Sequence, residues 1–304
     1  MPILTPPGPA CRLRFGAESA HVVRDRGGWL AHLPIDVLGG ENGETLPLAA
    51  GEVFEAGLVR GVKSDDGSVA GLVLVEAGDP VALEAAAAAA YSALFACLGP
   101  ASLCRVWNLV PDINDLHDGH ENYWRFNAGR RRAFEERFGI EGCEAHMPAA
   151  SAVGWDSPHL FVGFSATTAP VRFVENPNQV PAYRYPDRYG PRPPSFSRGA
   201  AVGQPPLAGF VSGTASIHGH ETVGMGDLKL QLEVTLGNIE TVMDQIGLAR
   251  FHSIKGYLRY SRDAETVREA LAARFGLPGA EALLLQADVC RPDLDVEIEA
   301  ILGA

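Results

Sequence analysis

The chain has 304 residues, a formal net charge of −12 and 46% hydrophobic residues, which fits a globular protein of one large domain or two ordinary ones. This acidic balance argues against nucleic acid or an anionic membrane as a partner. No apolar run is expected to reach the roughly 18 residues that span a bilayer, and the first residues lack the basic and apolar regions of a signal peptide. Five widely spaced cysteines without a CxxC pair predict reduced thiols in a cytoplasmic protein, with neither disulfides nor a zinc site.

The first half of the chain predicts alternating helices and strands. A helix from about Val81 to Leu98 precedes a strand from Leu103 to Val110. An inserted loop, Pro111 to Gly119, leads to a helix that ends at Phe138-Gly139, where glycine stops it. A strand from Ala149 to Val153 follows.

Two side-chain clusters in this half have open interpretations. Aromatic and amide residues near the insertion either border a pocket or pack a helix, and the run Arg130-Arg-Arg132 predicts a solvated helix face. The aromatic and amide residues are Trp107, Asn108, Asn122, Tyr123, Trp124, Phe126 and Asn127.

The stretch from Glu175 to Arg198 concentrates arginine, tyrosine and proline in an otherwise acidic chain. Arginine offers a planar fork that matches a carboxylate, tyrosine adds a hydroxyl donor, and proline restricts the backbone. We therefore predict a pocket for a small anion. The alternative is a proline-rich surface loop with solvated charges.

Small residues, hydroxyls and two histidines follow between Val211 and Asp227. Gly213 permits a close approach of backbone to a ligand. His218 and His220 suggest zinc, but the text from His220 to Gly224 is not HExxH. We predict no metal here, only a strand with a tight turn. No P-loop or Rossmann glycine pattern indicates a nucleotide.

The second half repeats the order of elements. Apolar residues recur at helical spacing from Leu232 to Ile246, and Gly247 ends that helix. A strand from Ile254 to Tyr260 and a helix from Asp263 to Phe275 follow, with Asp263 as N-cap. A strand from Leu283 to Cys290 comes next.

A direct repeat supports an internal duplication. Segments Arg137–Ala145 and Arg274–Ala282 share six of nine residues at an offset of 137. Two helices packed on a sheet in each copy predict an α+β fold of two units. We place the first unit, with a β-rich extension, at residues 1–170 and the second at 171–304.

At two positions that could carry chemistry, only the second copy of the repeat has an ionisable residue. The offset matches Cys290 with Val153 and Glu297 with Leu160, so we expect one working site. Glu297 and Glu299 point to one face of an apolar strand, where desolvation raises a carboxyl pKa and suits a general acid. The alternative is an edge strand with one solvent-exposed face. This alternative explains Glu299, and for Glu297 it stays open beside the catalytic interpretation. The alternative for Cys290 is a small buried hydrophobic residue.

The chain resembles the chorismatases over nearly its whole length, and the resemblance is most specific in five motifs. The second copy alone also resembles the small trimeric RidA/YjgF proteins, which implies a fold of two chorismate-mutase-like α+β halves. The chorismatase-like segments are 108–114, 121–130, 176–198, 212–221 and 286–299.

The resemblance implies that the enzyme removes pyruvate from chorismate, a cyclohexadiene with two carboxylates and an enolpyruvyl ether, without a cofactor. Glu297 corresponds to the family's catalytic glutamate. Gly213 and Cys290 resemble the branch that makes 3-hydroxybenzoate, whereas the hydrolytic branch has alanine at one or both positions. We expect Glu297 and Cys290 to be catalytic. The residues expected to bind substrate are Tyr183, Arg184, Tyr189, Arg192, Arg198, Gly213 and Arg259.

Several alternatives stay open at this stage. The product is 3-hydroxybenzoate, 4-hydroxybenzoate or a dihydroxycyclohexadiene carboxylate. A RidA-like protein that binds a small acid without converting it is a further alternative. The small-molecule substrate is the only partner expected, and the protein is either a monomer or a trimer.

Overall fold

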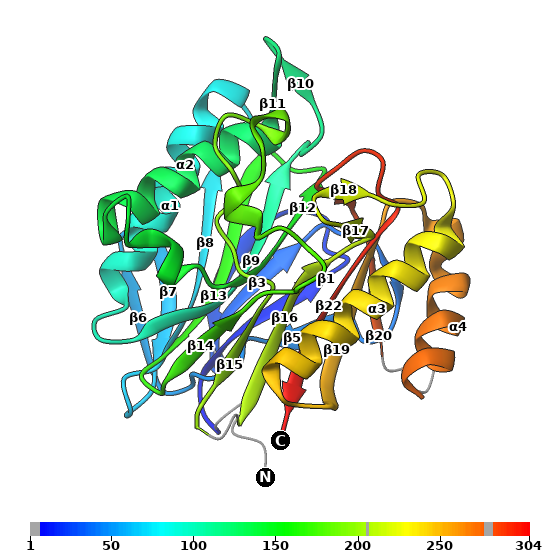
Figure 1. Cartoon of the computed structure of the whole chain (residues 1–304). Helices are drawn as coiled ribbons and strands as arrows, with labels where there is room; N and C mark the ends of the chain where they lie inside the picture. The colour runs from blue at the N-terminus through cyan, green and yellow to red at the C-terminus, as the bar shows by residue number, and fades with distance from the viewer. Residues whose placement is uncertain (1–6, 205–206, 277–281) are drawn as a thin grey trace.

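The computed structural model describes residues 7–204, 207–276 and 282–304. One seven-stranded sheet has the order β21-β12-β9-β13-β8-β7-β6. Helices α1 (Pro80–Cys97) and α2 (Asn122–Phe138) pack on each other and cover one face of it (Figure 1). Its strands are β6 (Glu52–Ala56), β7 (Val59–Lys63), β8 (Val69–Glu76), β9 (Ser102–Pro111), β12 (Ala149–Trp155), β13 (His159–Thr167) and β21 (Asp288–Val289).

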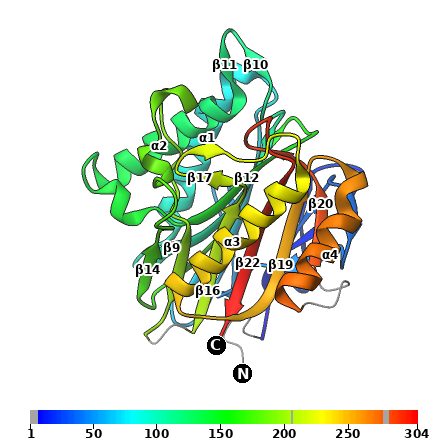
Figure 2. The ribbon, with the colours of Figure 1, turned by 45° about the vertical axis from the view of Figure 1, so that its right-hand side comes forward.

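A second seven-stranded sheet has the order β14-β15-β16-β22-β19-β20-β4. Helix α3 (Leu228–Ile246) packs on β16 and β22, and α4 (Ala264–Phe275) lies beside α3, as Figure 2 shows. The strands are β4 (Val37–Gly39), β14 (Val171–Val174), β15 (Gly199–Val202), β16 (Ala208–Thr214), β19 (Arg250–Leu258), β20 (Ala282–Gln286) and β22 (Val296–Gly303).

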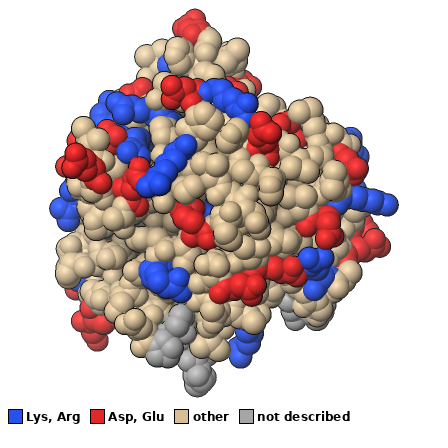
Figure 3. Space-filling view, in the orientation of Figure 1, with Lys and Arg blue, Asp and Glu red and all other residues tan. Residues whose placement is uncertain are grey.

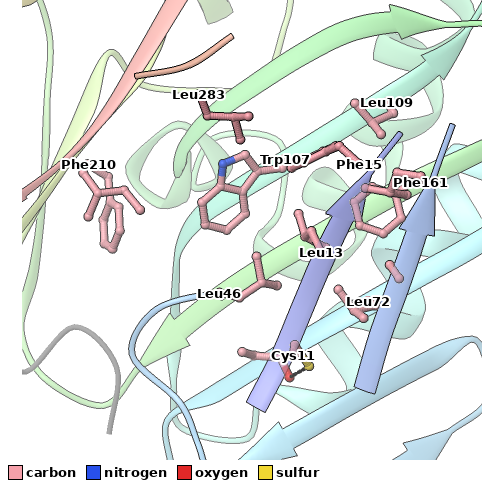
Figure 4. Packing of buried hydrophobic residues seen from close by; sticks show 14 of the residues in the cluster. Cys11, Leu13, Phe15, Leu46, Leu72, Trp107, Leu109, Phe161, Phe210 and Leu283 are labelled. Atoms are coloured by element: carbon pink, nitrogen blue, oxygen red, sulfur yellow. Dashed lines mark hydrogen bonds between the residues drawn. The ribbon is translucent and has the colours of Figure 1, made fainter. Parts of the chain in front are cut away.

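A four-stranded sheet, β2-β3-β1-β5, closes the interior between the two large sheets. Apolar residues of all three sheets form one core, in which Trp107 lies among Leu283, Leu13 and Phe15 (Figure 4). Two short hairpins, β10–β11 and β17–β18, stand apart from the sheets. These strands are β1 (Ala10–Phe15), β2 (His21–Asp25), β3 (Gly28–Leu33), β5 (Gly43–Thr45), β10 (Leu116–His117), β11 (His120–Glu121), β17 (Ile217–His218) and β18 (Glu221–Thr222).

The two large sheets have equivalent topology. The order β12-β9-β13-β8 in one corresponds to β20-β19-β22-β16 in the other, with a pair of helices at equivalent places in the chain. The expected α+β fold of two equivalent units is confirmed. The chain passes from one sheet to the other between β13 and β14, but β4 and β21 each join the sheet of the opposite half. The boundary placed at residue 170 stays a prediction, since these exchanged edge strands tie the halves together.

The helices follow their sequence signals. Asp79 caps α1 by accepting a hydrogen bond from the Val81 amide, and Pro80 starts the helix, which suits its fixed φ. Gly247 ends α3 and Gly276 ends α4, both in the left-handed conformation that glycine adopts without strain. The second repeat segment lies largely outside the described residues, at 277–281.

Two expectations about regular elements are wrong. The run from Leu283 to Cys290 is not one strand, because the chain leaves the second sheet at Ala287 and β21 pairs with Val153 and Gly154 of the first. The expectation that no apolar run reaches the length of a membrane span is also wrong, because helix α1 is long and apolar enough to cross a membrane by length and composition. Its apolar side packs on β8, β13 and α2, as expected for a core helix.

The surface charge is mixed on the face shown in Figure 3. Lysine and arginine side chains alternate there with aspartate and glutamate. Exposed ion pairs of the described surface include Arg274 with Glu240 and Arg188 with Glu221. Such pairs contribute little to stability.

Candidate active site

A cavity of about 300 Å³ lies where the two units meet, within the range of small-molecule sites. Helix α2 and strand β12 of the first unit supply one wall. The proline-rich segment, β16 and the loop before β22 supply the rest. Its central lining residues, from these five elements and from β22, are Arg130, Ser151, Tyr185, Arg198, Gly213, Cys290, Arg291 and Glu297.

Glu297 points into this cavity from β22, a central strand between β16 and β19. Its side chain is buried, and among the described residues its Oε1 atom has no hydrogen-bond partner. Burial, together with the negative Glu299, raises the pKa of Glu297 to about 8, against the opposing charges of Arg105 and Arg198. The group is therefore a neutral acid at pH 7 and holds a proton to donate.

Glu299 lies two residues further along the same face and has the opposite electrostatic character. Burial alone would raise its pKa, but Arg105 and Lys255 lower the pKa to about 2. The edge-strand explanation for Glu299 is wrong, because β22 is central and the side chain is buried. Two neighbouring carboxyl groups thus differ in protonation, as acid and charge stabiliser do in many enzymes.

Gly213 lies directly under the Glu297 carboxyl group. A Cβ atom at this position would lie 2.0 Å from Glu297 Oε1 and 2.6 Å from its Cδ. Strand β16 has an irregular register here, between Val211 and Thr214, which is typical of bulges near functional sites. Glycine is the residue that leaves room for the acid at this position.

Three arginines bring positive charge to the cavity, whose lining also includes the acidic residues Glu121 and Asp293. Among the described residues, no carboxylate forms an ion pair with Arg130, Arg198 or Arg291. Arg130 and Arg198 are buried, and the Nε atom of each lacks a hydrogen-bond partner. Buried cations of this kind are costly unless an anion compensates them. The cavity is therefore suited to an anionic ligand.

Tyrosines hold two of these arginines in place. Arg198 donates to the Tyr185 hydroxyl at 2.7 Å and to the Val180 carbonyl at 3.2 Å. Arg291 stacks on the Tyr189 ring, 4.0 Å from its centroid, and donates to the His220 carbonyl. These contacts fix the direction of each guanidinium before a ligand arrives.

Comparison with known proteins gives one consistent result. A family model described as the N-terminal part of FkbO/Hyg5-like chorismatases matches residues 50–166. A Streptomyces hygroscopicus protein named 3-hydroxybenzoate synthase is 39% identical over 236 residues, which are 70% of this chain and 68% of that protein. A Streptomyces rapamycinicus protein named chorismatase is 41% identical over 239 residues, 72% of this chain and 70% of its own length.

The chain belongs to the chorismatase family. A crystal structure of a chorismatase, 31% identical, aligns over 97% of this chain and 92% of its own with a TM-score of 0.85. The protein is an enzyme of this family, and its two equivalent α+β units are the two large sheets with their helices.

Five of the expected site residues line the cavity: Tyr189, Arg198, Gly213, Cys290 and Glu297. Their roles in the reaction stay predictions. Cys290 also packs against apolar residues of two clusters. Burial and the nearby Glu297 raise the pKa of its thiol to about 12. The thiol is neutral, which suits a role in shaping the cavity rather than nucleophilic attack.

Four expected binding residues lie outside the lining of the cavity. Tyr183 packs on the core of the first unit. Arg184 is exposed and paired with Glu144, and Arg192 is exposed with Glu135 3.6 Å away. The guanidinium of Arg259 donates to backbone carbonyls of the loop before β22, such as that of Arg291 at 2.9 Å, and so positions that loop instead of facing the cavity.

Several lining residues were not expected from the sequence. The solvated helix face predicted for Arg130 and Arg131 is wrong, because both are buried where α2 packs over β9. Arg130 donates to Asn127 Oδ1 at 2.9 Å, a partner one helical turn earlier. Tyr123 and Trp124, whose role was open, both line the cavity. An arginine in a helix next to an aromatic and amide cluster was the available signal.

Proposed function

We propose that this enzyme converts chorismate to 3-hydroxybenzoate and pyruvate. One observation carries the proposal: a single cavity combines three arginines that form no ion pair among the described residues and a buried glutamic acid whose raised pKa favours its protonated form. The arginines suit a substrate with two carboxylates, and the glutamic acid suits an enol ether that is cleaved after protonation. The names of the related Streptomyces proteins support the same substrate.

The arginines fix the two carboxylates of the substrate. Arg130 belongs to the first unit, and Arg198 and Arg291 belong to the second, so the cations approach from opposite walls. Charge-assisted hydrogen bonds to carboxylates are short and directional. Holding both ends of the molecule aligns the ether with Glu297 and lowers the entropic part of the barrier.

Glu297 starts the reaction by giving its proton to the terminal methylene of the enolpyruvyl group. The resulting oxocarbenium species loses the ring C–O bond and leaves as pyruvate. The neighbouring ring hydroxyl attacks the ring carbon that lost the ether oxygen, in place of water, and forms a protonated epoxide. The bond between this oxygen and its original carbon then breaks, and the carbon that keeps the oxygen loses its proton, which completes the aromatic ring. Chorismate then divides into 3-hydroxybenzoate and pyruvate without consuming water, and the ring proton balances the one that Glu297 gave.

Gly213 and Cys290 favour the 3-hydroxybenzoate outcome over hydrolysis. Gly213 lets the carboxyl group of Glu297 lie against the backbone, and the neutral Cys290 thiol fills space beside it. Both limit the room for a water molecule at the reacting carbon. Hydrolysis would instead consume one water and release a dihydroxycyclohexadiene carboxylate.

The test is to incubate the purified protein with chorismate, assay pyruvate, and identify the ring product by retention time and ultraviolet spectrum. We expect equal amounts of pyruvate and 3-hydroxybenzoate. Glu297→Gln should lower turnover by roughly 10²- to 10⁴-fold while the protein stays folded. A dihydroxycyclohexadiene product would overturn the assigned product, and absence of pyruvate would overturn the proposed function.

A further inference from the structure

Glu299 lies in a cage of donors that reaches across all three sheets. From the first sheet, Trp107 Nε1 donates to its Oε1 atom at 2.7 Å and Arg105 Nη2 lies 2.6 Å from its Oε2 atom. From its own sheet, Tyr257 donates at 3.0 Å and Lys255 Nζ lies 3.1 Å away. Every one of these side chains is buried.

The charges of the cage balance one another. Lys255 also pairs with Glu44 on β5 of the small sheet, and Arg105 also donates to Ser151 at 2.7 Å. Two cations and two anions therefore share the interior, so Glu299 stays ionised although it is buried. With its pKa lowered to about 2, Glu299 keeps its negative charge across the neutral pH range.

Glu297 is outside this cage although it is on the same face of β22. Tyr257 is its partner in the strand register, and Lys255 is the partner of Glu299. No cation of the cage forms an ion pair with Glu297 among the described residues. The titratable and charged groups that act on Glu297 are Arg105, Tyr123, Arg198, Tyr257, Cys290 and Glu299.

Of these groups, the fixed anion is the nearest along the strand. Arg105 is already engaged by Glu299 and Ser151, while Tyr123, Tyr257 and the Cys290 thiol are neutral. Carboxyl groups two residues apart on one strand face are roughly 7 Å apart. At an effective dielectric constant of about 20 their repulsion corresponds to roughly 1.7 pH units.

We propose that Glu299 is a positioning residue for the reaction: its fixed negative charge keeps Glu297 protonated at neutral pH, ready to give its proton to the substrate. This inference rests on the proposed function, in which the protonated form of Glu297 is the active one. Glu299 itself does not touch the substrate.

The test is the pH dependence of kcat/KM in Glu299→Gln and the wild type. An acid whose pKa is raised is active below that pKa, so wild-type activity should fall as pH rises through about 8. In Glu299→Gln the fall should occur at least one pH unit lower, since the repulsion is gone and one positive charge of the cage is left uncompensated. Glu233→Gln, the same change on an exposed part of α3, should leave the profile unchanged.

A second variant and a second readout keep the test decisive. If Glu299→Gln does not fold, Glu299→Gln with Lys255→Met removes an anion and a cation together, and a smaller downward shift is expected, because the repulsion is gone but no cation is left in excess. The carboxylic C=O infrared band that is lost in Glu297→Gln reports protonation of Glu297 without substrate. An unmoved or upward-moved titration in a folded variant overturns the inference. If the wild type does not convert chorismate but the infrared titration still shifts, the proposed function fails and the coupling stands.

Discussion

The contact between Gly213 and Glu297 makes Gly213→Ala the sharpest perturbation of the site. The new Cβ atom would lie 2.0 Å from Glu297 Oε1, where real Cβ contacts stay beyond 3.0 Å. Gly213 does not have a positive φ, so alanine meets no backbone strain and the strand should persist. The carboxyl group must therefore move by 1.0 Å or more.

Such a displacement has a predictable kinetic cost. Moving a reacting group by about 1 Å lowers the rate roughly 100-fold, which corresponds to about 2.7 kcal/mol of transition-state stabilisation. We expect kcat for 3-hydroxybenzoate to fall by that factor, with a larger share of the dihydroxycyclohexadiene product because water gains access. Steady-state assays with both products quantified by chromatography measure this change.

A matched glycine gives the control for this experiment. Gly237 lies in α3, and a Cβ atom added there would have no neighbour within 4 Å beyond the backbone of its own helix. Gly237→Ala should keep wild-type turnover and stabilise the fold by about 0.5–1 kcal/mol. A Gly213→Ala enzyme with unchanged kcat and unchanged product ratio would refute the placement of the Glu297 carboxyl group over Gly213.

Two further predictions concern the walls of the cavity. Cys290→Ala should shift the product from 3-hydroxybenzoate towards the dihydroxycyclohexadiene acid, and an unchanged ratio in chromatography would leave Cys290 a packing residue. Arg130→Gln should raise KM about 10- to 100-fold through loss of a charge-assisted contact, whereas Arg192→Gln, on the exposed surface, should leave KM unchanged. Equal KM values for these two variants in initial-rate assays would remove Arg130 from the carboxylate clamp.

The sequence predicts the fold well because its signals are local. Glycine stops and apolar periodicity predict α3 and α4, whereas the side chain of Asp263, the expected N-cap of α4, forms no capping hydrogen bond. The break after β20 could not be predicted, since a continuous apolar run does not show which sheet each part joins. That choice depends on pairing between β21 and β12, far apart in the chain.

The site was predictable in part for a similar reason. Glu297 lies on a regular strand, where alternation tells which side chains share a face. The proline-rich segment has no such period, so the sequence could not tell that Tyr185 faces the cavity and Tyr183 the core. Arg130 was missed because only the packing of α2 over β9 buries it.

The most direct measurement is a crystal structure of the enzyme with an unreactive analogue that keeps the ring and both carboxylates of chorismate. We predict that the carboxylates lie within hydrogen-bond distance of Arg130, Arg198 or Arg291. The carbon that replaces the vinyl terminus should lie about 3–3.5 Å from the carboxyl group of Glu297. An analogue bound outside this cavity, or bound inside it with that carbon turned away from Glu297, would contradict the account.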